Sequence, residues 1–575
     1  MNGPKDRHTV VDVLDRAALE FSEKKIQFFS PRQTAAPEEI TFAQFRDDAR
    51  ALAHHLHAAG VTAGTRAAVM ADRNIDFLKA FGALTYCGAV ITTLPPAPPA
   101  AVPNGHQVHG VLPSGLLDFV VTDERQATLL AETEQVVPHV LVLPAHPGVR
   151  EDDDPPTAPL PQVPAVGEND LAWIQYTSGS TSAPRGVGLT HRNIVAGLRV
   201  AVAGARARPQ DIMCHSLPLF HNMGLLFTLS AFECGHDLYI SPTDEFFKYP
   251  EGWLRKVEEC RASLLGGPNA FFTYLTSAIP REEVAAYDLS AVTTVLNGSE
   301  PIDPGSVRRF SEHFRPAHLT STATTPCYGL TEATLAVTCA ASDTEMEVDW
   351  VDSDSLRPGR RVVTVDPSDD RARPIVNCGP TVPEVEVRVT RRGTPLPDRS
   401  VGDIDVRGPS VMASYYGEDT AAVSDEGWLP TGDLGYLSQG CLYVTGRTKE
   451  ILISAGTNYY PQDVENAVRH LPGVLNENVA AVTLPPEPGA NLRERIGVVA
   501  ETDSPASARR HVVRRIRSAA ARRLNGATVD VTLVAPGALL RTPGGKLQRL
   551  RIGEMLAAGS LPQVIAHAGA SEMIA

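Results

Sequence analysis

A segment rich in hydroxyl groups and glycine is the part of this sequence best suited to bind an anion. It reads Thr177-Ser178-Gly179-Ser180-Thr181, follows the strand-like run 173–176, and leads to Pro184-Arg185-Gly186. Glycine lets the backbone approach a ligand closely, so N–H groups and hydroxyls can turn toward a polyphosphate. The Walker pattern is absent, and Arg185 supplies the positive charge where that pattern has lysine. Taken alone, such a segment is more often an ordinary polar turn.

Two carboxylates and a lysine, each in or beside a glycine-containing turn, supply further charges. They lie in Tyr328-Gly329-Leu330-Thr331-Glu332, in Thr431-Gly432-Asp433 and in Gly544-Gly545-Lys546. A carboxylate is a hard oxygen ligand suited to Mg²⁺, which bridges phosphate oxygens. An acceptor-only carboxylate also matches two ribose hydroxyls. Each of these three groups alone would more often be a solvated surface group, so the assignment depends on the whole series.

Size and composition limit the class of protein. A length of 575 residues exceeds what one hydrophobic core supports, so at least two domains are expected. The formal charge of −15 argues against a nucleic-acid binder and against an anionic membrane surface. The eight cysteines are scattered singly, which indicates neither a zinc ribbon nor a disulfide framework. Residues 1–25 lack a signal-peptide core, and no segment reads as a membrane span, so a cytoplasmic protein is expected.

Alternating helical and strand patterns predict a parallel sheet in the N-terminal part. Thr41 is expected to cap an amphipathic helix. A buried strand at 67–70, a helix at 77–86 and a strand at 89–91 then give a β–α–β order. This order is typical of α/β folds.

The pattern changes in the second half of the chain. Residues 385–389 and 403–406 alternate with period two, which predicts an antiparallel β unit. From Gly446 onward a smaller α+β region follows. We therefore expect an α/β protein with a large N-terminal domain, 1–447, built from parallel-sheet subdomains and a β unit. A small mobile lid domain, 448–575, completes the chain.

Further motifs follow the hydroxyl-rich segment in a fixed order. With residues 175–193, the series comprises 217–225, 266–269, 297–301, 328–335, 428–435, 446–450 and Lys546. The series resembles the adenylate-forming superfamily of acyl-CoA synthetases, peptide-synthetase adenylation domains and luciferases. Within that superfamily the chain is most similar to the fatty acyl-AMP ligases. The resemblance covers roughly residues 10 to 555.

The resemblance implies that ATP and Mg²⁺ activate a carboxylic acid as an acyl adenylate, with release of pyrophosphate. Because two anions meet in this reaction, the site must neutralise charge and hold the attack in line. The residues expected to act in catalysis are Thr177, His221, Thr331, Glu332 and Lys546. Glu332 would bind Mg²⁺, Thr331 would donate to the α-phosphate, and Lys546 would bridge that phosphate and the carboxylate.

The nucleotide is expected to contact several motifs at once. The backbone of 298–301 would stack on adenine, Tyr328 would cover its other face, and Asp433 with Arg447 would hold the ribose. The full set expected to bind ATP is Thr177, Ser178, Gly179, Ser180, Thr181, Arg185, Asn297, Gly298, Ser299, Glu300, Pro301, Tyr328, Gly329, Leu330, Thr331, Asp433, Arg447 and Lys546.

An extra segment, from about Cys339 to Arg373, bears on the acceptor. In fatty acyl-AMP ligases an insertion here restrains the mobile C-terminal domain and disfavours coenzyme A. The resemblance therefore implies a fatty or related apolar acid, a pocket near 221–227 and 297–298, and transfer to a separate acyl carrier protein. The segment also fits a surface loop of variable length. The alternatives are an acyl-CoA synthetase and, in another class, an inactive adenylate-binding scaffold.

Two residues depart from the family pattern, and the family pattern does not explain one run of basic residues. Arg185 stands where the superfamily usually has lysine; it keeps its charge and can bind bidentately, so function should survive. Asn222 replaces a common aspartate, which leaves the pairing of His221 open. The basic strip Arg509–Arg523 is either a surface that steers an acidic carrier protein or a solvated helix face.

Overall fold

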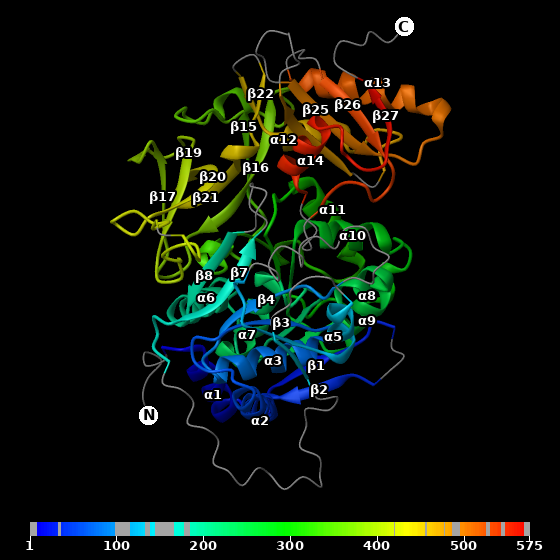
Figure 1. Cartoon of the computed structure of the whole chain (residues 1–575). Helices are drawn as coiled ribbons and strands as arrows, with labels where there is room; N and C mark the ends of the chain where they lie inside the picture. Colours follow the sequence, from blue (N-terminus) through cyan, green and yellow to red (C-terminus); the bar gives the residue numbers. More distant parts are fainter. Residues whose placement is uncertain are drawn as a thin grey trace.

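Five β-sheets carry the fold in the described part of this computed structural model, which comprises residues 8–32, 36–97, 115–132, 139–143, 166–177, 185–418, 420–454, 457–475, 478–485, 495–524, 529–541 and 547–568. Figure 1 shows a large body of blue to yellow segments, with a smaller orange and red unit beside it at the top. The sheets of eight, six and seven strands form the large body. This arrangement confirms the predicted α/β fold with a large N-terminal and a smaller C-terminal part.

The eight-stranded sheet contains the strands that end at the sequence motifs. Its order is β14 (Ala336–Cys339), β13 (Thr324–Gly329), β12 (Thr294–Asn297), β11 (Leu264–Gly267), β9 (Ile212–His215), β10 (Asp237–Ile240), β1 (Lys25–Phe28) and β2 (Glu38–Thr41). The six inner strands are parallel, and only the two edge strands pair antiparallel. The carboxyl ends of β9, β11, β12 and β13 therefore lie at one edge of the sheet.

The six-stranded sheet presents the predicted phosphate segment. Its order is β6 (His139–Val142), β5 (Phe119–Thr122), β3 (Arg66–Met70), β4 (Val90–Thr93), β7 (Leu171–Thr177) and β8 (Arg185–Thr190). The first five strands are parallel, whereas β7 and β8 pair antiparallel. The hydroxyl-rich segment thus joins the two strands of a hairpin.

Helices of the large body share one core with these two sheets. They include α1 (Val10–Glu20), α2 (Phe42–Ala58), α3 (Asn74–Tyr86), α6 (His191–Gly204) and α7 (Asn222–Cys234). The predicted cap of α2 is confirmed, because Thr41 and Gln44 exchange hydrogen bonds of 3.1 and 3.0 Å. The predicted β–α–β order is also confirmed, with α3 beginning at Asn74 and β4 extending to Thr93.

The seven-stranded sheet is the predicted antiparallel unit. Its order is β15 (Val348–Asp352), β16 (Ala372–Pro380), β21 (Cys441–Arg447), β20 (Leu429–Ser438), β19 (Gly402–Arg407), β17 (Glu386–Arg391) and β18 (Thr394–Pro395). The extra segment 339–373 supplies the edge strand β15 and buries Val351, Leu356 and Val362 against Tyr436 and Tyr443. It is therefore packed structure and not a loose surface loop.

The smaller unit has a core of its own. Its sheet is β24 (Val479–Leu484), β25 (Arg495–Glu501), β26 (Val529–Val534) and β27 (Val564–Ala568), with the hairpin β22 (Leu452–Ser454) and β23 (Thr457–Tyr459) beside it. Its helices are α12 (Pro461–Val468), α13 (Ala506–Arg523) and α14 (Arg549–Ala557). Two of its hydrophobic clusters contain only residues from 452 onward. None of the helices in the described part of the chain combines the length and apolarity needed to cross a bilayer.

A buried histidine fastens α1 to α6 and makes stability depend on pH. The backbone N–H of Val10 donates to Nδ1 of His191 at 3.2 Å, and burial lowers the pKa of His191 to about 4. The unfolded chain would protonate this group near pH 6.5. Below that pH the unfolded state binds a proton that the folded state does not, so stability falls between pH 6.5 and 4.

We expect His191→Gln to flatten that dependence, because the amide oxygen can accept from Val10 without titrating. One such proton corresponds to a slope of about 1.4 kcal/mol per pH unit. Urea unfolding at several pH values between 7.5 and 4 measures the free energy of unfolding for both proteins. Parallel curves for wild type and variant would show that His191 does not set the slope.

Candidate active site

Four of the sequence motifs meet at the carboxyl edge of the eight-stranded sheet. They follow β9, β11, β12 and β13, which are parallel to one another. Ligands in open parallel sheets bind in the crevice outside the carboxyl ends of the strands. Residues that are over 100 positions apart, such as His221 and Thr331, are thereby assigned to one edge.

A buried carboxylate joins the eight-stranded sheet to the seven-stranded sheet. Asp433 accepts a hydrogen bond from the Tyr328 hydroxyl at 2.7 Å and pairs with Nε of Arg447 at 2.9 Å. Asp433 and Arg447 are direct neighbours across β20 and β21. Burial, together with the charge of Asp433, raises the pKa of Tyr328, so its hydroxyl keeps the proton that it donates. The structure thus brings together the three residues predicted to enclose adenine and ribose.

Glu332 lies in a tight turn that is anchored on both sides. The turn Thr331–Ala333 directly follows β13 and Leu330, and the Glu332 carbonyl accepts from the N–H of Met412 at 2.9 Å. The hydroxyl of Thr334, a residue with φ of 66°, donates to the Ser410 carbonyl at 2.7 Å. The Glu332 carboxylate accepts from the Tyr415 hydroxyl at 3.0 Å. One oriented carboxylate fits Mg²⁺, which proteins commonly bind through one or two carboxylates together with substrate phosphates.

Arg185 begins β8 and is held by two residues that the sequence analysis missed. Its guanidinium carbon lies 3.6 Å from the centroid of the Tyr415 ring. Its Nε and Nη2 donate to Glu418 at 2.7 and 2.5 Å. Tyr415 and Glu418 come from the connection between β19 and β20, far along the sequence from Arg185. No spacing or motif in the sequence indicates these contacts.

The segment expected to contact adenine is partly buried and partly open. Asn297 is buried, and its amide donates to Asn269 at 3.3 Å, while Gly298 is also buried. Ser299, with φ of 70°, and Pro301 are exposed. Glu300 accepts from the N–H of Ala270 at 2.6 Å. These contacts fix the backbone shape of the segment and leave its exposed side available for a ligand.

The structure gives one contact of His221 and the contact of its neighbour Asn222. His221 caps α7, and its Nδ1 accepts from the N–H of Met223 at 3.4 Å. Asn222 does not serve as a local partner in place of the aspartate, because its amide donates to the Thr334 carbonyl at 3.3 Å. Asn222 therefore ties α7 to the Glu332 turn.

Some predicted residues lie outside the described part of the chain. These are Ser178, Gly179, Ser180, Thr181 and Lys546. Thr177, the last residue of β7, and Gly329, the last residue of β13, belong to the described part. Arg541 and Leu547, on either side of the undescribed residues 542–546, form an antiparallel β-bridge. Burial lowers the pKa of Arg541, and the charge of Glu300 opposes that shift. Arg541, which precedes the undescribed residues, is therefore within electrostatic range of Glu300 in the segment expected to contact adenine.

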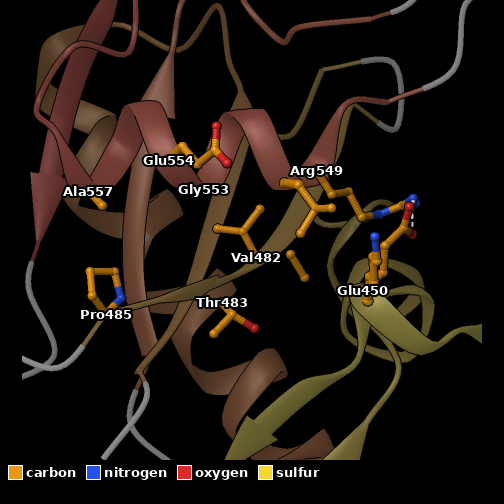
Figure 2. Close-up of a pocket in the computed structure, with 11 residues that line it drawn as sticks. Glu450, Val482, Thr483, Pro485, Arg549, Gly553, Glu554 and Ala557 are labelled. Carbon is orange, nitrogen blue, oxygen red and sulfur yellow. Dashed lines mark hydrogen bonds and ion pairs between the residues drawn. The ribbon is translucent and has the colours of Figure 1, made fainter. Parts of the chain in front are cut away.

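Ion pairs bracket the turn that joins the large body to the smaller unit. Arg447 pairs with Asp433 before the turn Thr448–Glu450. After it, Nη1 of Arg549 lies 3.1 Å from Glu450, and the same guanidinium binds Glu465 at 2.7 and 2.9 Å. Figure 2 shows Arg549 and Glu450 pointing toward each other at one end of a hollow of about 290 Å³ between α14 and β24.

The extra segment contacts the smaller unit at three points. Nε of Arg373 pairs with Asp463 at 2.7 Å. The hydroxyl of Tyr460 donates to the carbonyl of Leu356 at 2.9 Å. Arg523, in α13, donates to the carbonyl of Asp370 at 3.2 Å. The segment therefore links the seven-stranded sheet to α12 and α13.

Comparison with known proteins identifies the family. The sequence profile of the AMP-binding enzyme family matches residues 14–416. The chain belongs to this family. It is 32% identical to the long-chain-fatty-acid–AMP ligase FadD32 of Mycolicibacterium smegmatis, covering 91% of this chain and 89% of that protein. It is 28% identical to the medium-chain-fatty-acid–[acyl-carrier-protein] ligase JamA of Moorena producens, covering 96% of each.

A solved structure agrees with the fold of this AMP-binding enzyme. It comes from a study of fatty acyl-adenylate ligases from E. coli and L. pneumophila. The TM-score is 0.86 at 29% identity, with 96% of this chain and 98% of the other covered. The resemblance inferred from the motifs is therefore confirmed.

Gly329 is required for the turn that carries Glu332. A Cβ at this position would lie 1.8 Å from the carbonyl oxygen of Leu335. We expect Gly329→Ala to push β13 and β14 apart, to lower stability by about 1–3 kcal/mol and to weaken ATP binding. Thermal unfolding and calorimetric ATP titration measure the two effects.

Gly167→Ala is the matched control, because the nearest atom to its added Cβ is 3.6 Å away. The control should unfold and bind ATP as the wild type does. A Gly329→Ala protein with the stability and ATP affinity of this control would contradict the steric argument.

Proposed function

We propose that this enzyme activates a fatty acid with ATP and passes the acyl group to the phosphopantetheine thiol of a separate acyl carrier protein. The observation that carries the proposal is the group Tyr328, Asp433 and Arg447, which joins β20 and β21 to the end of β13, the strand that leads to Glu332. The similarity to fatty-acid–AMP ligases supports the fatty acid and adenylation, and the similarity to an acyl-carrier-protein ligase supports the acceptor. The proposed use of ATP, which is available inside cells, supports a cytoplasmic location. The eight cysteines, all free, support it as well.

The side chains of the site suit the two ends of the nucleotide. Asp433 can accept from ribose hydroxyls while Arg447 balances its charge, and Tyr328 can cover the base. Thr331 and Arg185 can donate to phosphate oxygens. Mg²⁺ held by Glu332 would neutralise phosphate charge during the displacement. Lys546 would add a charge that acts on the transition state.

The smaller unit is proposed to act as a lid that pivots at Thr448 and Lys449. Arg447 is fixed to the large body through Asp433, and Glu450 is fixed to the smaller unit through Arg549. Only two residues lie between these anchors, so a change of orientation must be absorbed there. Hinges are commonly a few element-terminal residues that absorb large backbone changes. The division into residues 1–447 and 448–575 follows from the same argument.

The contacts of the extra segment support the carrier protein over coenzyme A. Arg373, Leu356 and Asp370 bind the smaller unit in the orientation described above. Arg373 is mostly buried, stacks on Tyr460 and also donates to the Thr445 carbonyl. Such contacts favour the adenylation orientation and oppose the rotation that acyl transfer needs. A docked carrier protein can supply binding energy for that rotation that a small thiol lacks.

Lys546→Ala should cripple adenylation and leave ATP binding nearly unchanged, because the lysine acts on the developing transition state. A loss of about 3 kcal/mol is usual for one such group. Acid-dependent pyrophosphate release measures adenylation, and calorimetry measures ATP binding.

Lys248→Ala is the matched control, because Lys248 pairs with Asp244 on an exposed helix. It should keep full activity. Wild-type adenylation by the Lys546 variant would remove this residue from the site. A wild-type protein that binds ATP but releases no pyrophosphate with any acid would instead favour the inactive scaffold.

When the wild-type enzyme is offered both coenzyme A and a holo carrier protein, it should acylate the carrier protein and form little acyl-CoA. Arg373→Met should raise acyl-CoA formation, because it removes the ion pair with Asp463 and preserves most of the stem. Arg371→Met is the control, since Arg371 is exposed and pairs only within the extra segment, with Asp352 and Asp369. Mass spectrometry of products from a chain-length series of acids measures both outcomes.

Efficient acyl-CoA formation by the wild type would establish the acyl-CoA synthetase alternative. Equal acceptor use by the Arg373 and Arg371 variants would show that the contact with Asp463 does not restrain the lid. If the enzyme activated only amino acids or aromatic acids, the proposal that its substrate is a fatty acid would be wrong.

A further inference from the structure

Tyr415 lies between the two charged groups expected at the phosphate end of the nucleotide. We propose that Tyr415 is a positioning residue that holds Glu332 and Arg185 in the geometry needed for a divalent cation and the phosphates. The inference rests on the proposed function, since it concerns the same site. It assigns a role to the connection between β19 and β20, which none of the sequence motifs covers.

The backbone around Tyr415 is docked on both neighbours. Tyr415 forms a β-bridge with Val187 of β8, and the N–H of Tyr416 donates to the Gly186 carbonyl at 2.8 Å. On the other side, the N–H of Met412 donates to the Glu332 carbonyl at 2.9 Å. The segment therefore connects the beginning of β8 to the turn that contains Glu332, and Tyr415 is fixed relative to both.

The hydroxyl of Tyr415 orients the carboxylate of Glu332. It donates to Oε1 at 3.0 Å. Among the described residues, none donates a hydrogen bond to Oε2, the other oxygen of the same carboxylate. A phenol is protonated at neutral pH, and a carboxylate can only accept, so the hydroxyl is the donor. A hydrogen bond to one oxygen fixes the direction of the other, as outer-shell donors do for metal-binding carboxylates.

The ring of Tyr415 orients Arg185. The guanidinium carbon lies 3.6 Å from the ring centroid, and the flat cation can stack there while its N–H groups point outward. Two of these N–H groups bind Glu418, in a pair whose side chains are 40% and 36% exposed. Exposed ion pairs are weak, so phosphate oxygens can replace Glu418 while the ring keeps the guanidinium in place.

Tyr415→Phe tests the proposal because it removes only the hydroxyl. The Mg²⁺ concentration for half-maximal pyrophosphate release should rise about tenfold or more, the range seen when an outer-shell partner is removed. The rate at saturating Mg²⁺ should return close to that of the wild type. Calorimetric ATP titrations at increasing Mg²⁺ should show the same shift in the absence of turnover. Tyr415→Leu should in addition raise KM for ATP at saturating Mg²⁺, because Arg185 loses its stacking surface.

Tyr416→Phe is the matched control, since Tyr416 lies close enough to Arg66 to raise the pKa of that guanidinium, and no hydrogen bond joins Tyr416 to Glu332 among the described residues. It should leave the Mg²⁺ dependence unchanged. A Tyr415→Phe enzyme with the Mg²⁺ midpoint of the wild type would overturn the proposal. If the wild type released no pyrophosphate with any acid, the proposed reaction would fail, and the calorimetric shift would still decide the role of Tyr415.

Discussion

The buried carboxylate of Asp433 is the interaction on which the rest of the site depends. It accepts from Tyr328 at the end of β13 and pairs with Arg447 at the end of β21, so one charge joins two sheets. A buried charge is tolerated only where hydrogen bonds and an opposite charge replace the water that it loses. Tyr328 and Arg447 supply both. The group therefore holds the end of β13 against the ends of β20 and β21, where the motifs of the two sheets meet.

Features with a local physical signal could be predicted from the sequence. The capping box of Thr41 and Gln44, the period-two strands β17 and β19, and the parallel order of β3 and β4 depend on neighbours along the chain. Asp433 and Arg447 were expected at one ribose site, and the register of β20 and β21 makes them neighbours.

Contacts between distant segments could not be predicted in this way. Tyr415 meets Glu332 and Arg185 only because the connection after β19 docks on β8, and no motif surrounds it. Asn222 turns to Thr334 and not to its neighbour His221, which depends on how α7 packs against the Glu332 turn. The extra segment was expected as an insertion. That it adds β15 to a sheet and contacts α12 depends on register and burial that composition does not encode.

Under the proposed function, the ion pair of Asp433 and Arg447 lies between the nucleotide site and the turn that leads to the smaller unit. Arg447 is the last residue of β21, and the turn Thr448–Glu450 begins with the next residue. Ribose hydroxyls that donate to Asp433 would compete with Arg447 for the same oxygens. A ligand at the ribose site therefore acts directly on the anchor that fixes one end of the hinge, and the Glu450–Arg549 pair fixes the other end. Under the proposed function, nucleotide binding would therefore act on the orientation of the smaller unit through this ion pair, beside the contacts that the extra segment makes with α12 and α13.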